Sequence, residues 1–207
     1  MVLEEYLLCD QKRVAGLDEA GRGCLAGPVT AAAVILPPKF NHPLLNDSKK
    51  MGVEEREDLR IIIEEEALAW AVAFVSPARI DQINILWASI EAMHLALDQL
   101  SLSPQHLLVD GNRFRPYKEI PFECVVRGDG KFTSIAAASV LAKTHRDAYM
   151  IHRHDSYPMY GWKSNKGYPT REHREGIRIH GPCKLHRQSF KLIPEEQLSF
   201  WSDSDEY

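Results

Sequence analysis

The chain has 207 residues, of which 44% are hydrophobic, and its 25 Lys and Arg against 29 Asp and Glu give a net charge of −4. These values are typical of a globular domain with a sizeable core, so they exclude intrinsic disorder and collagen-like repeats. The longest apolar segment, Val29–Leu36, is far shorter than the ~20 residues needed to span a bilayer as a helix, so we expect no membrane association.

The first half of the chain predicts two neighbouring strands, a helix and a third strand. Arg13–Leu17 and Val29–Leu36 are short apolar segments joined by a glycine-rich turn, and Pro37 closes the second, which favours strands over helices. Glu54–Ala67 has apolar positions at helical spacing between glutamates, and Trp70–Val75 is again strand-like.

The second half of the chain predicts two longer helices and two short strands. Asn84–Leu100 carries apolar residues at helical spacing, with Asn84 as its expected N-cap. Two short apolar strands, Leu107–Val109 and Phe122–Val126, precede a long helix that we expect over about Thr133–His154. Strands alternating with helices predict a layered α/β domain, but the pattern does not distinguish parallel from antiparallel pairs.

Acidic side chains gather where the apolar strands end. They are Asp18, Glu19, Asp110 and Asp129, each close to a glycine. In open α/β sheets the carboxyl ends of strands form binding sites, so the four carboxylates would converge if these strands are neighbours. Asp before Gly is also typical of ordinary turns, and for Asp110 or Asp129 alone a turn is the better interpretation. The four together favour a site.

Clustered carboxylates predict bound cations. Four of them would repel one another and raise each other's pKa values, and divalent cations relieve this repulsion. All-oxygen ligation selects Mg²⁺ or Mn²⁺. Two such ions ~3.5–4 Å apart can hold the attacking and leaving oxygens of an in-line phosphoryl displacement. The acidic cluster therefore predicts a two-metal site for phosphoryl transfer.

The segment Gly16–Pro28 is dense in glycine, yet it lacks the GK[ST] ending of a P-loop and the full GxGxxG spacing. Glycines let the backbone approach a ligand closely and offer N–H groups to phosphates. Arg22, between Gly21 and Gly23, could reach a phosphate or a sugar. Taken alone, the segment is better interpreted as a tight turn between two strands.

Basic residues concentrate in residues 140–191, which hold eleven Lys and Arg against four Asp and Glu. Such a block within an acidic chain favours a surface that contacts a polyanion, although a solvated helical face explains it equally well. Lys143 and Arg146 share one helix face and, with Lys166 and Lys49, could follow a phosphate backbone.

We expect a single domain over residues 1–192 and an acidic, flexible tail over residues 193–207. The four cysteines are far apart and form no CxxC pair, and the N-terminus is acidic where a secretory signal is basic. We therefore expect a protein of the reducing cytoplasm, and we expect a monomer.

Five blocks of the chain, in the same order, resemble ribonuclease HII, the type 2 ribonuclease H. They are Gly16–Pro28 with Asp47-Ser48-Lys49-Lys50, Val109–Asn112, Gly128–Asp147, Asn165–Thr170 and His186–Phe190. Type 3 enzymes differ in having lysine where this chain has Arg22 and an extra N-terminal domain, so the resemblance favours type 2. One departure is Asn165, where many relatives have histidine.

The resemblance implies an RNase H-like α/β fold, with a mixed β-sheet flanked by helices and a helical C-terminal part that binds nucleic acid. It implies an endoribonuclease that uses two Mg²⁺ or Mn²⁺ ions to hydrolyse the RNA strand of RNA/DNA hybrids. The family also nicks 5′ of ribonucleotides embedded in duplex DNA, leaving 3′-hydroxyl and 5′-phosphate ends. Its partners would thus be RNA/DNA hybrids and ribonucleotide-containing duplex DNA.

The resemblance also implies roles for particular residues. The catalytic and metal-binding acids of the family correspond to Asp18, Glu19, Asp110 and Asp129. The glycine–arginine–glycine backbone that senses the 2′-hydroxyl corresponds to Gly21, Arg22 and Gly23. The family tyrosine, which packs on the sugar of the following deoxynucleotide, corresponds to Tyr168.

Two other functions remain open at this point. Another RNase H-like nuclease, such as a Holliday-junction resolvase, would share the clustered acids but would not need to recognise a 2′-hydroxyl group. A non-catalytic module that binds hybrids would use the basic block alone, and the presence of all four acids argues against it.

Overall fold

The computed structural model describes residues 13–47 and 52–194 of the chain. The strands are β1 (Val14–Ala20), β2 (Val29–Ile35), β3 (Ala69–Val75), β4 (His106–Asp110) and β5 (Phe122–Val125). The α-helices are α1 (Val53–Glu66), α2 (Pro77–Gln99), α3 (Thr133–His154), α4 (Trp162–Asn165) and α5 (Arg171–His180). Short 3₁₀ turns are η1 (Pro43–Asp47), η2 (Gly128–Gly130) and η3 (Pro158–Tyr160).

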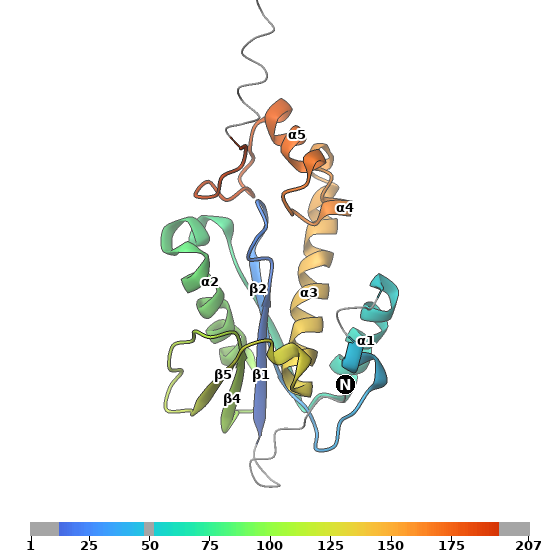
Figure 1. Ribbon diagram of the computed structural model, residues 1–207, viewed down its shortest axis with the longest axis vertical. Helices are drawn as coiled ribbons and strands as arrows, with labels where there is room; N and C mark the ends of the chain where they lie inside the picture. Colours follow the sequence, from blue (N-terminus) through green and yellow to red (C-terminus); the bar gives the residue numbers. More distant parts are fainter. Residues whose placement is uncertain (1–12, 48–51, 195–207) are drawn as a thin grey trace, which may run out of the picture.

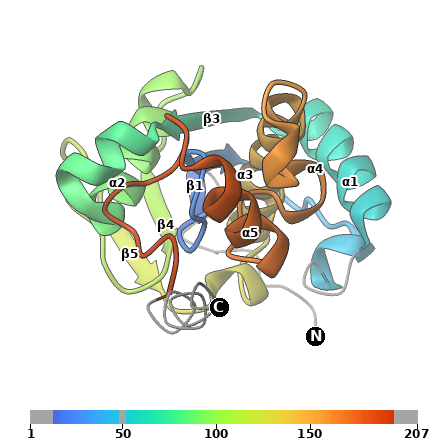
Figure 2. The same cartoon turned by 90° about the horizontal axis from the view of Figure 1, so that it is seen from above.

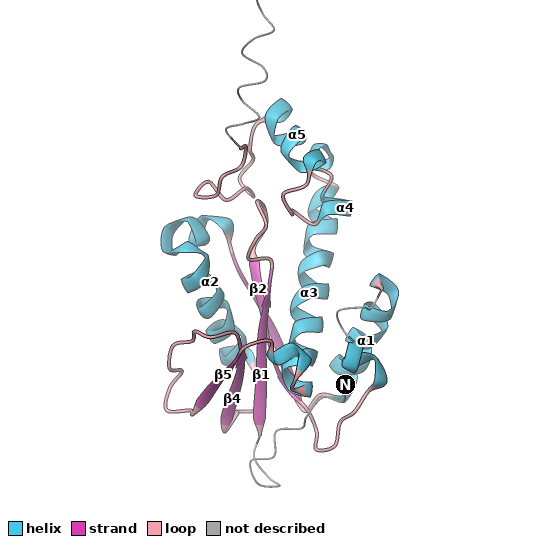
Figure 3. Ribbon diagram, in the orientation of Figure 1, coloured by secondary structure: helices cyan, strands magenta, loops and turns pink. Residues whose placement is uncertain are grey.

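The strands form one mixed sheet in the order β3-β2-β1-β4-β5. The neighbouring strands β1, β4 and β5 lie side by side in Figure 3. β1 pairs antiparallel with β2 and parallel with β4, and β4 pairs parallel with β5. The expected mixed α/β sheet flanked by helices is confirmed. Because β1, β4 and β5 run in the same direction, their carboxyl ends meet at one edge of the sheet, next to the centre of the fold.

Helices cover both faces of the sheet, with α2 on one side and α3 and α1 on the other (Figures 1 and 2). All seven residues of β2 are buried, and alternate side chains pack on opposite layers. Ala31 and Ala33 belong to the core beneath α2, whereas Ala32 and Val34 belong to the core beneath α3 and α1. This explains why the segment is continuously apolar rather than alternating.

α3 packs unusually close to the central strand. A Cβ atom on Gly16 of β1 would lie 2.2 Å from the backbone carbon of Ser134, so only glycine fits at this point. The alanines at 136–138, in the first turns of α3, are fully buried against the sheet. Small side chains on both elements therefore set the position of α3, which carries several residues of the site.

The C-terminal part lies beyond the end of the sheet, where α3 extends past the strands and meets α4 and α5 (Figure 1). A separate hydrophobic cluster holds it together, with Trp162, Tyr160, Ile177 and Met150 buried. The expected helical C-terminal part is confirmed. No helix in the described part of the chain is both long enough and apolar enough to cross a bilayer.

Two boundaries differ from those expected by more than one residue. β1 continues through Asp18 and Glu19 to Ala20, so both acids lie in the strand and not after it. α2 starts seven residues, about two turns, earlier than expected, at Pro77, and is interrupted at Asn84, which has φ 64° and ψ 167°. The Asn84 side chain accepts hydrogen bonds from the N–H groups of Leu86 and Trp87, at 3.0 and 3.3 Å, so its expected capping role is confirmed.

Candidate active site

The acidic residues come together through the pairing of β1 with β4. Leu17 of β1 pairs with Val109 of β4 in the parallel ladder. Asp18 and Asp110 are the next residues of these two strands, so they lie at the same edge of the sheet. The N–H group of Gly128 donates to Oδ1 of Asp110 at 2.7 Å. This bond ties the turn that carries Asp129 to the end of β4, so residues distant in the sequence share one edge of the sheet.

The charges of these acids are coupled. Burial raises the pKa of Asp18 well above its usual value, and the neighbouring Glu19 and Asp110 carboxylates raise it further. Burial also raises the pKa of Glu19, against the opposing effect of the Arg22 guanidinium. Only 7% of the Asp18 surface is exposed. A cation close to these groups would relieve both the burial and the repulsion, which is the electrostatic setting of a metal site.

The carboxylates are only partly gathered, however. Among the residues that the structure describes, no three acidic, histidine or cysteine side chains are close enough together to hold a metal ion. Glu19 instead pairs with Arg22, with 3.0 Å between Oε1 and Nη1. Oδ1 of Asp18 accepts the N–H group of Glu19 at 2.7 Å, and its carboxyl group also bonds Ser139. The donor chemistry fits a hard divalent cation, but the Glu19 side chain would have to leave Arg22 to ligate one.

Two hollows meet at Glu19. One, of about 230 Å³, lies towards α2 and is also lined by Arg22, Asp110 and Asn112. The other, of about 310 Å³, lies towards α3. Its lining includes Glu19, Gly21, Asp129, Ser139, Lys143 and Tyr168. The second hollow thus brings together two of the predicted acids, Glu19 and Asp129, with Gly21 of the glycine-rich loop and with Tyr168.

The glycine-rich loop, residues 21–28, is held from two sides. The N–H group of Leu25 donates to the carbonyl of Gly167 at 2.8 Å, and Ala26 forms an antiparallel bridge with His186. Gly21 has φ 91°, in the region that favours glycine. Arg22 and Gly23 are exposed at the tip, while Gly21 and Cys24 beside them are buried. The loop is therefore a fixed feature that presents two residues to solvent.

Tyr168 lies at the mouth of the larger hollow, with 40% of its surface exposed. Its hydroxyl shares a hydrogen bond with the Cys24 side chain of the loop. The preceding turn is organised by the buried Asn165, whose Oδ1 accepts the N–H group of Gly167 at 2.8 Å and whose Nδ2 donates to the carbonyl of Tyr160 at 2.7 Å. The unusual Asn165 thus shapes the backbone beside Tyr168.

The basic residues selected from the sequence have different surroundings. Lys143 lines the larger hollow and donates to Asp147, and its Nζ lies 5.9 Å from the centre of the Tyr168 ring. Lys166 donates to the carbonyl of Lys163 at 2.5 Å. Lys49 lies outside the described residues.

Arg146 does not lie on the surface where a phosphate backbone would pass. Its side chain is 1% exposed and donates three hydrogen bonds to the carbonyls of Pro28, Lys166 and Ala26, at 3.1, 2.9 and 3.1 Å. The expectation of a phosphate contact is therefore corrected: helical spacing placed Arg146 with Lys143, but the C-terminal part and the loop cover it.

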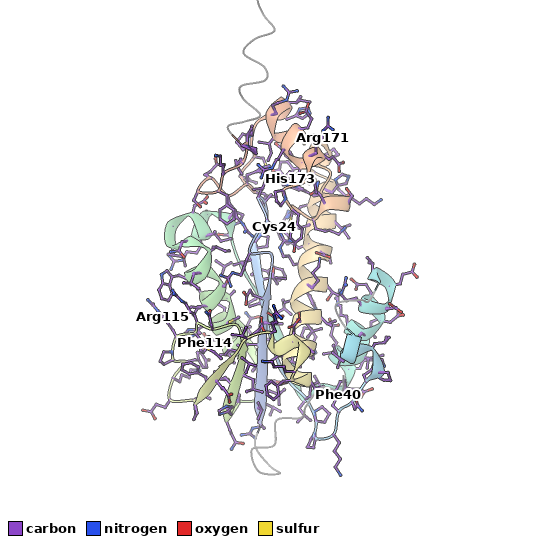
Figure 4. All side chains as sticks on the ribbon, viewed as in Figure 1. Cys24, Phe40, Phe114, Arg115, Arg171 and His173 are labelled. Atoms are coloured by element: carbon purple, nitrogen blue, oxygen red, sulfur yellow. The ribbon has the colours of Figure 1, made fainter. Side chains whose placement is uncertain are left out.

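Sequence reasoning assigned no role to the buried histidines His173 and His186. His173, on α5, is labelled in Figure 4. The Cys183 N–H group donates to Nδ1 of His186, so His186 carries its proton on Nε2 and donates it to Nε2 of His173, 3.2 Å away. Nδ1 of His173 then donates to the carbonyl of Tyr168 at 2.9 Å. The single lone pair on Nε2 of His173 is shared by two donors, because Trp162 donates to the same atom at 3.0 Å. Both rings are satisfied as neutral imidazoles.

Ser139 and Arg187 were also not predicted from the sequence as site residues. Ser139 bonds Asp18 from the second turn of the buried face of α3, and Arg187 bonds the carbonyls of the loop. The signal for Arg187 was present, because it lies in one of the blocks that carry the family resemblance, but nothing in a single sequence distinguishes a buried arginine from an exposed one.

The architecture is shared with solved nucleases. The chain is similar to ribonuclease H2 from Pyrococcus horikoshii OT3, with a TM-score of 0.72, 25% identity, and coverage of 87% of this chain and 94% of that one. It also has the fold of Bst-RNase HIII, solved in complex with Mn²⁺, with a TM-score of 0.67, 18% identity, and coverage of 87% of this chain and 68% of that one. These likenesses define the class as RNase H-like nucleases.

The sequence comparisons narrow this class to one family. The family model described as Ribonuclease HII matches residues 15–193. A curated ribonuclease HII from Christiangramia forsetii is 59% identical over 183 residues, covering 88% of this chain and 92% of the relative. The chain therefore belongs to the ribonuclease HII family, which degrades the RNA of RNA/DNA hybrids, and it is a nuclease and not merely a binding module.

Proposed function

We propose that the protein hydrolyses the RNA strand of RNA/DNA hybrids and nicks duplex DNA on the 5′ side of single embedded ribonucleotides. Asp18, Glu19, Asp110 and Asp129 are the catalytic acids, and the products carry 3′-hydroxyl and 5′-phosphate ends. The reaction depends on two divalent ions, Mg²⁺ or Mn²⁺, and contributes to removing ribonucleotides from DNA.

The observation that carries this proposal is the composition of the larger hollow. Glu19 and Asp129 line it together with Gly21 of the loop and with Tyr168. A single sugar–phosphate unit placed there would touch a carboxylate, the glycine-rich backbone and an aromatic ring at once. An all-DNA nuclease such as a junction resolvase has no need for such an arrangement, because it does not test the 2′ position.

The four acids would hold the cations, and the bound cations would activate the attacking water and stabilise the leaving 3′-oxygen. Support comes from the raised pKa values of Asp18 and Glu19, because buried and mutually repelling carboxylates gain the most from a divalent ion. Ser139 keeps Asp18 oriented from α3, and Gly128 keeps one oxygen of Asp110 fixed. When the cations bind, the ion pair between Arg22 and Glu19 would open, and Arg22 would bind a substrate phosphate in its place.

Two neighbouring sugars are distinguished in different ways. The N–H groups at the loop tip, around Arg22 and Gly23, recognise the 2′-hydroxyl of the ribonucleotide. The half-exposed ring of Tyr168 packs on the face of the next sugar, where a 2′-hydroxyl group would collide with it. Together these two contacts define a junction from ribonucleotide to deoxyribonucleotide.

The test is a comparison of four labelled substrates of matched sequence. They are an RNA/DNA hybrid, a DNA duplex with one ribonucleotide, an all-DNA duplex and an all-DNA four-way junction. With Mg²⁺ or Mn²⁺ we expect cleavage of the first two only, with the nick on the 5′ side of the ribonucleotide. With excess EDTA we expect no cleavage of any of them.

The outcomes separate the alternatives. Cleavage of the four-way junction without cleavage at the ribonucleotide would identify a resolvase activity. Cleavage of the hybrid but not of the single-ribonucleotide duplex would remove the junction role of the loop and Tyr168 while leaving the acids in place. Undiminished cleavage in EDTA would refute the dependence on metal.

A further inference from the structure

Two arginines are completely enclosed behind the glycine-rich loop. Arg187 and Arg146 are 0% and 1% exposed. Within residues 13–47 and 52–194 neither forms an ion pair with a carboxylate, and every hydrogen bond recorded for their guanidinium groups goes to a main-chain carbonyl. Burying a charge without a counter-ion is costly, so a structure that retains two of them needs them for something specific.

Both arginines donate to the end of the loop that leads into β2, but only Arg187 also donates to the loop tip. Arg146, from α3, donates to Ala26 and Pro28 near the start of β2. Arg187, from the segment after α5, donates through Nη2 to the carbonyl of Gly21 at 2.7 Å and through Nη1 to the carbonyl of Arg22 at 2.9 Å. Its Nε donates to Gly27 at 3.1 Å. Arg187 is thus the residue that grips the loop tip.

The grip on the carbonyls fixes where the N–H groups point. The peptide bonds of the described residues are all trans, so the C=O and N–H of each peptide unit point in opposite directions. The carbonyls of Gly21 and Arg22 point inward at Arg187, and the N–H groups of Arg22 and Gly23, which belong to the same two peptide units, therefore point outward. Arg22 and Gly23 are exposed, and a Cβ on Gly23 would meet nothing within 4 Å.

We propose that Arg187 is a positioning residue for ribonucleotide selection: its guanidinium fork turns two successive N–H donors of the loop tip towards the substrate. The inference rests on the proposed function, because it takes the 2′-hydroxyl of the ribonucleotide, or its adjoining phosphate, as the ligand of these donors. Arg187 itself touches no substrate. It acts by holding two peptide units in one orientation before the substrate arrives.

The chemistry favours arginine over any other residue at this position. A planar guanidinium can donate to two neighbouring carbonyls at once, whereas the lysine ammonium is a point charge on a flexible chain. Burial lowers the pKa of Arg187 to about 10, so the group keeps its charge at neutral pH. A charged donor also polarises both peptide units and strengthens their outward N–H groups as donors.

The experiment measures selectivity rather than activity alone. We take the full chain with Asp110→Asn, to prevent cleavage, and compare its affinity for a duplex with one ribonucleotide and for the all-DNA duplex of the same sequence. The same ratio is measured after adding Arg187→Lys, which keeps the charge, or Arg187→Gln, which keeps two donors on a shorter side chain. Thermal unfolding establishes that each variant is folded.

The matched control is Arg174→Lys. Arg174 also donates to two successive carbonyls, those of Lys191 and Leu192 at 3.3 and 2.5 Å, but it lies on α5 away from the loop tip. A general loosening of the C-terminal part would affect both arginine variants alike. A loss of selectivity confined to the Arg187 variants identifies the orientation of the loop tip as the cause.

We expect Arg187→Lys and Arg187→Gln to lower the affinity ratio roughly tenfold, equivalent to about 1.4 kcal/mol, chiefly through weaker binding of the ribonucleotide duplex. We expect Arg174→Lys to leave the ratio unchanged. A folded Arg187 variant with the parent's ratio would overturn the inference and leave the proposed function intact. Equal affinity of the parent itself for both duplexes would overturn both.

Discussion

The backbone of α3 packs directly on Gly16 of β1, and the Gly16→Ala substitution tests this contact. In Gly16→Ala, the new Cβ would lie 2.2 to 2.4 Å from backbone atoms of Ser134 and Ile135. Ordinary Cβ contacts begin near 3.4 Å, so α3 would have to recede by about 1 Å. No side-chain rotation relieves the clash, because the atoms it meets belong to the main chain.

The loss in free energy of unfolding should lie at the upper end of the range for overpacked cores. Overpacking destabilises by about 1–3 kcal/mol, and contact with backbone leaves little room for adjustment, so we expect about 3 kcal/mol. In a domain of this size this lowers the Tm by roughly 6–12 °C. Activity should fall further than stability alone explains, because α3 also carries Ser139 and Lys143 into the site, and a shift of 1 Å in catalytic groups can cost about a hundredfold in rate.

The assay is thermal unfolding beside cleavage of an RNA/DNA hybrid at a temperature where the variant is folded. The control is Gly130→Ala, because a Cβ at Gly130 would meet nothing within 4 Å, and its Tm should move by less than about 2 °C. A Gly16→Ala variant as stable as the Gly130→Ala control would show that α3 is not held against β1 at this distance.

Three further predictions concern the site and its support. Because burial and neighbouring carboxylates raise the pKa of Asp18, its ionisation destabilises the metal-free fold as pH rises above about 4. Asp18→Asn should therefore raise the Tm in EDTA at pH 8 and remove most of the stabilisation by Mn²⁺. An unchanged Mn²⁺-induced Tm shift would contradict a metal at Asp18. Burial lowers the pKa of His186 to about 4, so protonation of this ring opposes folding below pH 6.5. In urea unfolding we expect the free energy of unfolding to be highest above pH 6.5 and to fall by roughly 3 kcal/mol towards pH 4, with a flatter pH profile in His186→Gln. Equal slopes for the two proteins would show that His186 does not cause the pH dependence. Tyr168→Ala should leave the Tm within about 2 °C, since the residue is 40% exposed, while cleavage at a single ribonucleotide falls at least tenfold. An equal loss of cleavage on a long hybrid would place the ring outside junction recognition.

The elements of the fold could be predicted because their sequence signals are local. The buried strand Val29–Ile35 is continuously apolar, and the long helix Thr133–His154 has a clear period and small residues where it meets the sheet. Strand order was beyond reach, because parallel and antiparallel pairing depends on contacts between segments far apart in the chain. Asp18 and Glu19 were expected after the first strand, since they interrupt its apolar run, yet the backbone pairing continues through both.

Some residues of the candidate site could likewise be predicted from the sequence, and others could not. Four acids could be selected because aspartate at the end of an apolar strand is conspicuous, and the family resemblance pointed to Gly21, Arg22 and Gly23. The supporting residues could not be selected, because Arg187 donates to main-chain carbonyls, which leave no complementary side chain in the sequence, and Ser139 is an ordinary polar residue within a helical segment. Arg146 illustrates the limit: its spacing on the helix predicted a surface charge, and only the contacts with residues 26–28 and with Lys166 make it a buried one.

The most direct test of the central claim, that convergent carboxylates perform the hydrolysis, is the rate at which Asp110→Asn nicks a DNA duplex with one embedded ribonucleotide in Mn²⁺. The asparagine oxygen can still accept the Gly128 N–H group, so the fold and the affinity for the duplex should be kept. We expect the nicking rate to fall by about a thousandfold or more. A rate close to that of the unsubstituted protein, with unchanged binding, would contradict the assignment of these acids as the hydrolytic centre.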